Sequence, residues 1–165
     1  MTDHAALPYR ANVGAAVFNR AGKILIARRA DLKRLASHPW QLPQGGIDGN
    51  EDPRHAVLRE LREEIGTDAA TIIGEIPVWL NYDFPPEIMA QPGAKHRGQR
   101  QRWFALRFTG TDDMIRLDTH APPEFDAWRW TDLGEIVDLA VPFKRPTYQR
   151  VARDFAPFAK PEGAD

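Results

Sequence analysis

Residues 45–67 constrain this chain more than any other stretch, and they read GGIDGNEDPRHAVLRELREEIGT. A glycine-rich turn at 44–46 leads into a segment with strong helix start and stop signals. Asp52 is a favourable N-cap, and Pro53 suits the first helical position because its missing N–H would be unpaired there. Gly66 can adopt the left-handed conformation that ends helices. The stretch therefore predicts a helix from about Pro53 to Gly66.

The predicted helix has an apolar stripe beside an acidic one. The apolar stripe follows the helical repeat and comprises Val57, Leu58, Leu61 and Ile65. Glu60, Glu63 and Glu64 lie at spacings of three and four, where like charges repel and weaken a helix. Mg²⁺ prefers one or two carboxylates together with substrate phosphates, so a metal would stabilise this face. Arg59 and Arg62 could instead pair with a solvated acidic face, and spacing alone leaves both interpretations open.

The stretch resembles the signature box of the Nudix hydrolase family. Eight residues match that box in register: Gly45, Glu51, Arg59, Glu60, Leu61, Glu63, Glu64 and Gly66. Thr67 departs from the apolar residue that ends the box, and we interpret it as a packing variant. The resemblance implies a loop–helix–loop that holds Mg²⁺ or Mn²⁺, as more than one ion, against a pyrophosphate.

Length and composition indicate one ordinary globular domain. The 165 residues predict a single domain with a flexible arm at 1–8 and a short tail at 159–165. The net charge of −1 gives no overall attraction to nucleic acid or membrane, so we expect no DNA partner, and any RNA contact must be local. The absence of cysteine excludes disulfides and thiolate metal sites. Without a long apolar segment or a signal-peptide pattern, the expected location is the cytoplasm. The oligomeric state is left open.

The rest of the chain alternates between strand and helix patterns. Strands are expected at 13–18 and 23–27, which form a hairpin, and at 40–42, 72–82 with a bend at Pro77, 100–108 and 125–130. Helices are expected at 132–139, capped by Asp132, and at 142–158; loops are expected at 28–38, 83–98 and 109–124. This order predicts an α/β or α+β fold, a mixed β-sheet sandwiched between helices, and the Nudix resemblance implies the same architecture.

Five further segments extend the resemblance over most of the chain. They read YRANVG at 9–14, WQLPQGG at 40–46, GQRQRWF at 98–104, PEFDAWRW at 123–130 and FKR at 143–145. As an ordered set they are similar to the bacterial RNA pyrophosphohydrolase branch of the Nudix family. That branch, with its plant relatives, is also described as dinucleoside polyphosphate hydrolases.

The resemblance implies metal-dependent hydrolysis of a phosphoanhydride. The expected substrate is 5′-triphosphorylated RNA, which would lose pyrophosphate and keep a 5′-monophosphate, initiating RNA decay. One alternative is a hydrolase of dinucleoside polyphosphates such as diadenosine tetraphosphate. Another is a catalytically silent nucleotide- or RNA-binding module, which the complete glutamate set disfavours.

The resemblance also assigns roles to the acidic residues. Glu124, in the segment 123–130, matches a further metal ligand, so the expected ligands are Glu60, Glu63, Glu64 and Glu124. Glu63, Glu64 and Glu124 are the expected catalytic groups, with Glu64 and Glu124 as the two candidates for the general base. Glu51 and Arg59 are expected to form a supporting pair that, with Gly45, orients the box.

Basic and aromatic residues supply the candidate substrate contacts. The resemblance implies that Arg10, Arg100 and Arg102 lie near the phosphates, and guanidinium groups can grip phosphate with two parallel donors. The alternative is that they are solvated strand charges. Phe143 and Tyr82 are the candidates for stacking on a nucleobase, although an aromatic residue in a short chain more often belongs to the core.

Overall fold

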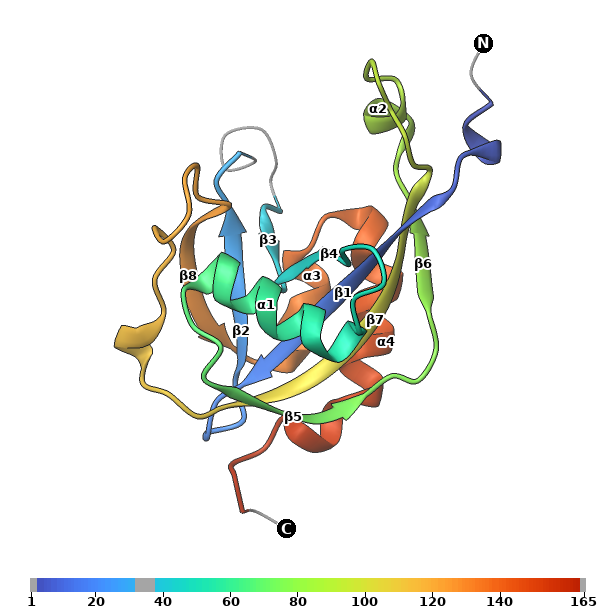
Figure 1. Cartoon of the computed structure of the whole chain (residues 1–165). Coiled ribbons are helices and arrows are strands. Elements are labelled where there is room, and N and C mark those ends of the chain that lie inside the picture. The colour runs from blue at the N-terminus through green and yellow to red at the C-terminus, as the bar shows by residue number, and fades with distance from the viewer. Residues whose placement is uncertain (1–2, 32–37, 164–165) are drawn as a thin grey trace.

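The computed structural model describes residues 3–31 and 38–163, and within them eight strands form one mixed sheet (Figure 1). Two long strands lie at its centre: β1 (Tyr9–Phe18) runs parallel to β7 (Gly98–Phe108) over their whole length. Around them pair β2 (Ile24–Arg29), β3 (Trp40–Gln41), β4 (Gln44–Gly46), β5 (Ala70–Glu75), β6 (Leu80–Asp83) and β8 (Phe125–Thr131).

Helices cover both faces of the sheet (Figure 1). The α-helices are α1 (Pro53–Ile65), α2 (Pro86–Met89), α3 (Ile136–Leu139) and α4 (Arg145–Asp154). Short 3-10 helices occupy His4–Ala6, Asp112–Met114, Leu133–Glu135, Pro142–Lys144 and Ala156–Phe158. One apolar core lies between the sheet and α1, and the other lies between the sheet and α3 with α4. The predicted fold, a mixed sheet between helices, is confirmed.

Strand β7 contributes to both cores, as its alternating sequence predicts. Phe104 and Leu106 belong to the core under α1, whereas Trp103 and Ala105 belong to the core under α3 and α4. Successive side chains of a strand point to opposite faces, so a strand covered on both sides carries apolar residues at odd and even positions alike.

The predicted helix at 53–66 and its two caps are confirmed. The Asp52 side chain accepts a hydrogen bond from the Arg54 N–H at 2.8 Å, and Gly66 ends α1 with φ of 80°. At Gly66 a Cβ would also press against the carbonyl oxygen of Arg116, so both conformation and space require glycine. Leu61 and Ile65 of the predicted stripe are buried.

Three predictions of local structure are wrong. The glycine turn expected at 44–46 is strand β4, because its residues pair antiparallel with residues 12–14 of β1. The single strand expected at 72–82 is divided into β5 and β6 around Pro77. The long helix expected at 142–158 is α4 with a 3-10 turn before and after it.

The remaining differences concern caps and loops. Asp132 precedes a 3-10 turn without a side-chain capping bond, since its carboxylate pairs with Lys23 instead. The expected loop at 28–38 begins two residues late, because β2 extends through Arg29, and its residues 32–37 lie outside the described part of the chain. In the expected arm, residues 4–6 form a 3-10 turn, and the Ala5 carbonyl accepts a hydrogen bond from Arg97.

Candidate active site

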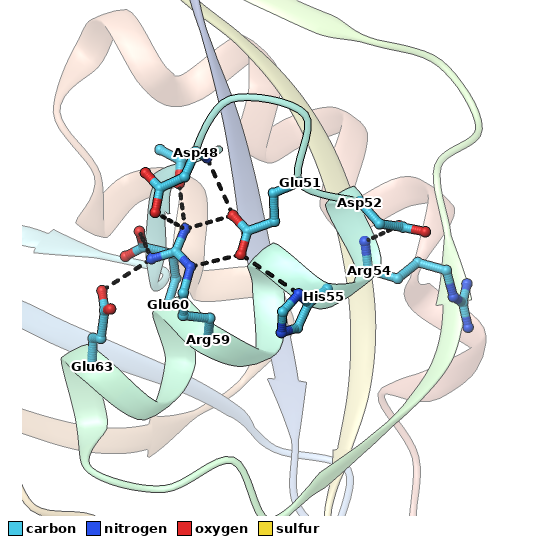
Figure 2. A network of polar contacts seen from close by, with 9 residues as sticks. Asp48, Glu51, Asp52, Arg54, His55, Arg59, Glu60 and Glu63 are labelled. Atoms are coloured by element: carbon cyan, nitrogen blue, oxygen red, sulfur yellow. Dashed lines mark hydrogen bonds and ion pairs between the residues drawn. The ribbon is translucent and has the colours of Figure 1, made fainter.

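Arg59 of α1 is the centre of a polar network that joins the helix to the loop before it (Figure 2). Its guanidinium donates to both carboxylate oxygens of Glu51, each at 2.8 Å, and to the Gly46 carbonyl at 2.8 Å. The same group donates to Glu60 at 2.9 Å and to Glu63 at 3.2 Å. Arg59 therefore holds the entry loop, strand β4 and two glutamates of the acidic face in one arrangement.

The pair of Glu51 and Arg59 is charged at any physiological pH. Hydrogen bonds from Arg59, with a further one from the Asp48 N–H, lower the pKa of Glu51 to about 2. The Glu51 carboxylate in turn raises the pKa of Arg59. The geometry agrees with the supporting role predicted for this pair.

Glu64 is the most buried of the glutamates, with 7% of its surface exposed. Its carboxylate accepts a hydrogen bond from the Gln44 N–H of β4 at 3.1 Å. Burial raises the pKa of Glu64 well above its usual range, and the negative charges of Glu124 and Glu60 raise it further. Burial likewise raises the pKa of Glu60. A nearby cation would oppose these shifts because it favours the ionised carboxylates.

The glutamates line a hollow of about 140 Å³ between α1 and the loop that precedes β8. Its walls are Glu60, Glu63, Glu64, Leu117, His120, Pro122, Pro123 and Glu124. The structure thus brings Glu124 together with the three helix glutamates, although 60 positions separate Glu124 from Glu64 along the chain.

The donor set in this hollow suits a hard divalent cation. Within residues 3–31 and 38–163, no three His, Asp or Glu side chains already form a metal cage, and Glu60 and Glu63 are hydrogen-bonded to Arg59. Four carboxylates nevertheless line one hollow, and two of them have pKa values raised by burial and mutual repulsion. Clustered carboxylate oxygens are the ligands that Mg²⁺ and Mn²⁺ prefer.

Gly45 has a steric role at this site. Its Cα faces the Glu60 carboxylate so closely that a Cβ at this position would overlap the carboxylate. A side chain at position 45 would therefore have to displace the Glu60 carboxylate from its place in the hollow.

A larger cavity of about 370 Å³ has Lys144 in its wall, and the charge of this lysine interacts with that of Glu64. Its walls include Arg29, Trp40, Gln41, Ile88, Phe143 and Lys144. Phe143 faces this cavity as a half-buried side chain, as expected of a stacking residue. Tyr82 is buried behind it, with ring centroids 5.7 Å apart, and burial raises the Tyr82 pKa to about 12. The structure therefore places Phe143 at the cavity and Tyr82 in support of it.

Lys144 is a site residue that the sequence analysis missed. Its Nζ donates to the Gln41 side chain at 2.9 Å, and the lysine is buried. Burial lowers the Lys144 pKa to about 7, Arg29 lowers it further, and the charges of Glu64 and Glu124 oppose the shift. The available signal was its position directly after Phe143 in the matched segment 143–145.

The three arginines predicted to bind phosphate do not lie together. Arg10 is adjacent to Gln99 in the parallel pairing, whereas Arg100 is adjacent to Ala11, so Arg10 and Arg100 lie on opposite faces of the sheet. Arg10 lies against Gly46 of β4, beside the site.

Arg100 and Arg102 have other partners on their own face. The Arg100 guanidinium lies 4.0 Å from the centre of the Trp79 ring, and Arg102 donates to Glu75 at 2.9 Å. Arg10 therefore lies beside the site, whereas Arg100 and Arg102 lie on the other face of the sheet with partners of their own.

A buried chain of hydrogen bonds connects the core to the site. The Trp103 indole N–H donates to Gln101 at 3.1 Å, which directs the Gln101 amide nitrogen away from the indole. That nitrogen donates to Asn12 at 2.8 Å and to the Gln44 side chain at 3.3 Å. Since the Gln44 backbone N–H binds Glu64, the chain positions the strand that holds this carboxylate.

Comparison with known proteins identifies the family. The family model described as NUDIX domain matches residues 8–151, so the chain belongs to the Nudix hydrolase family and is an enzyme that acts on phosphoanhydrides. The RNA pyrophosphohydrolase of Acidiphilium cryptum is 73% identical over 99% of this chain and 100% of its own length. That of Gluconacetobacter diazotrophicus is 57% identical over 98% and 99%.

A solved structure supports the fold assignment. The structure of the E. coli dihydroneopterin triphosphate pyrophosphohydrolase is similar with a TM-score of 0.65 and 17% identity, and covers 89% of this chain and 99% of its own. The predicted family and enzyme class are confirmed. In the described part of the chain, no helix has the length and apolar character needed to cross a membrane.

Substituting Gly45 tests the close approach of β4 to α1. Gly45→Ala should displace the Glu60 carboxylate and lower kcat/KM by about 10- to 100-fold, the range typical of substitutions in groups that support a metal site. The Mg²⁺ concentration for half-maximal rate should rise. The matched control is Gly134→Ala, since a Cβ there meets nothing within 4 Å. Equal kinetics for both variants would contradict the steric role of Gly45.

Proposed function

We propose that this chain is an RNA pyrophosphohydrolase. It hydrolyses a phosphoanhydride of 5′-triphosphorylated RNA, releases pyrophosphate and leaves a 5′-monophosphate, which initiates RNA decay. The observation that carries the proposal is the surroundings of Glu64: it lines the acidic hollow with Glu124, and its charge also interacts with Lys144, which lines the larger cavity. One cavity suits metal and phosphate, and the other offers Phe143 to a nucleobase. The full-length relatives named RNA pyrophosphohydrolase support the same reaction.

Four glutamates would hold the Mg²⁺ or Mn²⁺ ions of this reaction: Glu60, Glu63, Glu64 and Glu124. Bound divalent ions supply Lewis-acid polarisation of phosphate oxygens and lower the pKa of water. Glu64 and Glu124 are the candidates for accepting the proton of the attacking water. Arg59 and Glu51 keep the helix glutamates and β4 in place while substrate binds.

Cations and aromatic rings of the chain bind the rest of the substrate. Arg10, which lies against Gly46, and Arg29 and Lys144, which line the larger cavity, neutralise phosphate charge. Phe143, supported by Tyr82, stacks on a base. Positioning and charge neutralisation are the main contributions that proteins make to phosphoryl transfer.

A dinucleoside polyphosphate hydrolase is the second candidate. The cavity of about 370 Å³ has the size of small-molecule sites, so it would accept the adenine of such a substrate as well as an RNA base. A catalytically silent binding module is the least favoured function, because all four glutamates are present in one hollow.

Rates on both substrates test the function directly. One preparation is assayed with 5′-triphosphorylated RNA and with diadenosine tetraphosphate, and products are separated by charge. We expect faster turnover of RNA to its monophosphate. Glu64→Gln should lower kcat/KM by more than about 100-fold, beyond the decreases typical of groups outside the ligand set. Full activity in excess EDTA would exclude the proposed metal dependence, and a clear preference for the dinucleotide would favour the second candidate.

Arg10 and Arg100 form a matched pair for testing the phosphate contact. Arg10→Ala should weaken binding of triphosphorylated RNA and reduce the slope of log K against log salt by about 0.7 for each phosphate that is no longer neutralised. Arg100→Ala should leave both quantities unchanged, because Arg100 lies on the face of the sheet opposite Arg10. Equal effects of the two substitutions would overturn this assignment.

Substitutions that remove or enlarge the ring test whether Phe143 stacks on a base. Phe143→Ala should lower kcat/KM by about 5- to 150-fold, because base–aromatic stacking contributes about 1–3 kcal/mol. Phe143→Trp should keep most of the activity because a larger ring still stacks. Thermal melts provide the control: a strongly destabilised Ala variant whose folded fraction has normal kcat/KM would place Phe143 in the core instead.

A further inference from the structure

Trp40 lies where the larger cavity meets a basic part of the sheet. Its partly exposed ring lines the cavity beside Phe143. The Arg129 guanidinium of β8 lies 4.8 Å from the centre of this ring, and that of Arg28 in β2 lies 6.0 Å from it. We call Arg28, Trp40 and Arg129 the basic edge.

Strand pairing places the basic edge on one face of the sheet. Trp40 pairs with Arg28 across β3 and β2, and Arg129 pairs with Ile26 across β8 and β2. Paired residues share a face, and so do residues two apart in a strand. The three side chains therefore form a continuous surface next to the cavity, built on three regular strands.

The positive charge of the basic edge belongs mainly to Arg129. Arg28 is paired with Asp126 at 2.7 Å, which neutralises it. Arg129 is exposed, and its contact with the Trp40 ring is its one polar interaction among the residues that the structure describes. A guanidinium stacked on an indole retains its hydrogen-bond donors and can still bind phosphate.

We propose that the basic edge binds the single-stranded RNA that follows the nucleotide held at Phe143. This inference rests on the proposed function, because a polynucleotide whose 5′ end lies in the cavity must leave over the cavity rim. Trp40 offers a ring face to a base or ribose, and Arg129 offers a charge to the next phosphate. The net charge of −1 gives no general attraction to RNA, so this local patch supplies it. A dinucleoside polyphosphate has no such chain.

RNA length is the variable that tests the proposal. Two 5′-triphosphorylated RNAs, a dinucleotide and a decanucleotide with the same 5′ sequence, are compared in binding without metal and in hydrolysis. Arg129→Ser should weaken binding of the decanucleotide by about 2- to 5-fold, the scale of an exposed charge contact. It should also reduce the salt slope by about 0.7. Both effects should be smaller for the dinucleotide, because only one nucleotide can follow the one held at Phe143.

Two matched variants give the controls. Arg129→Lys keeps the charge and should restore most of the decanucleotide affinity. Arg20→Ser removes another exposed arginine, in the turn between β1 and β2. This variant should bind both RNAs with the affinity of the wild-type protein. Because Arg129 is exposed, its variants should have the same melting temperature as the wild-type protein.

The outcomes separate this inference from the proposed function. Equal decreases in affinity for both RNAs, or an unchanged decanucleotide affinity, would overturn the basic edge. Failure of the proposed function would instead leave the wild-type protein unable to hydrolyse either RNA. In that case the binding measurements without metal would still decide whether affinity depends on RNA length through Arg129.

Discussion

The ion pair between Arg59 and Glu51 is the interaction on which the site depends. Isolated surface pairs contribute little, but this one is bidentate, largely shielded from water and extended by bonds to β4 and to two further glutamates. Without Arg59, carboxylates that repel one another would face the same hollow with no internal cation. The arginine thus makes an acidic helix face compatible with a folded protein before any metal binds.

The sheet determines how the two cavities relate to each other. Strand β4 pairs with β1. The buried carboxylate of Glu64 accepts a hydrogen bond from the backbone N–H of Gln44 in this short strand. Glutamates of α1 line the acidic hollow, and the buried Lys144 lines the larger cavity. A substrate with an anionic centre and an aromatic end matches this asymmetry of charge. The hydrogen-bond chain through Gln101 keeps β4 in register between them.

Local signals allowed much of this arrangement to be predicted, and long-range pairing explains what could not be. Helix α1 was predictable because Asp52 and Gly66 act within one turn of its ends. Strand β4 was missed because its partners are on β1, 30 positions earlier between Gly14 and Gln44. The opposite faces of Arg10 and Arg100 follow from a parallel register that sequence periodicity cannot supply. Lys144 was missed because its burial depends on elements distant in sequence.

The parallel pairing of β1 with β7 has a consequence for how this chain is made. The first long strand can complete the centre of the sheet only after residues 98–108 have been synthesised. Until then a strand that contains Val13, Val17 and Phe18, all fully buried in the folded protein, has no native partner along one edge. Pairings between distant segments close late and slow folding, so the nascent chain exposes an aggregation-prone strand for much of its synthesis. The pairing that forms the centre of the mature sheet thus leaves its first long strand unpaired along one edge until late in synthesis.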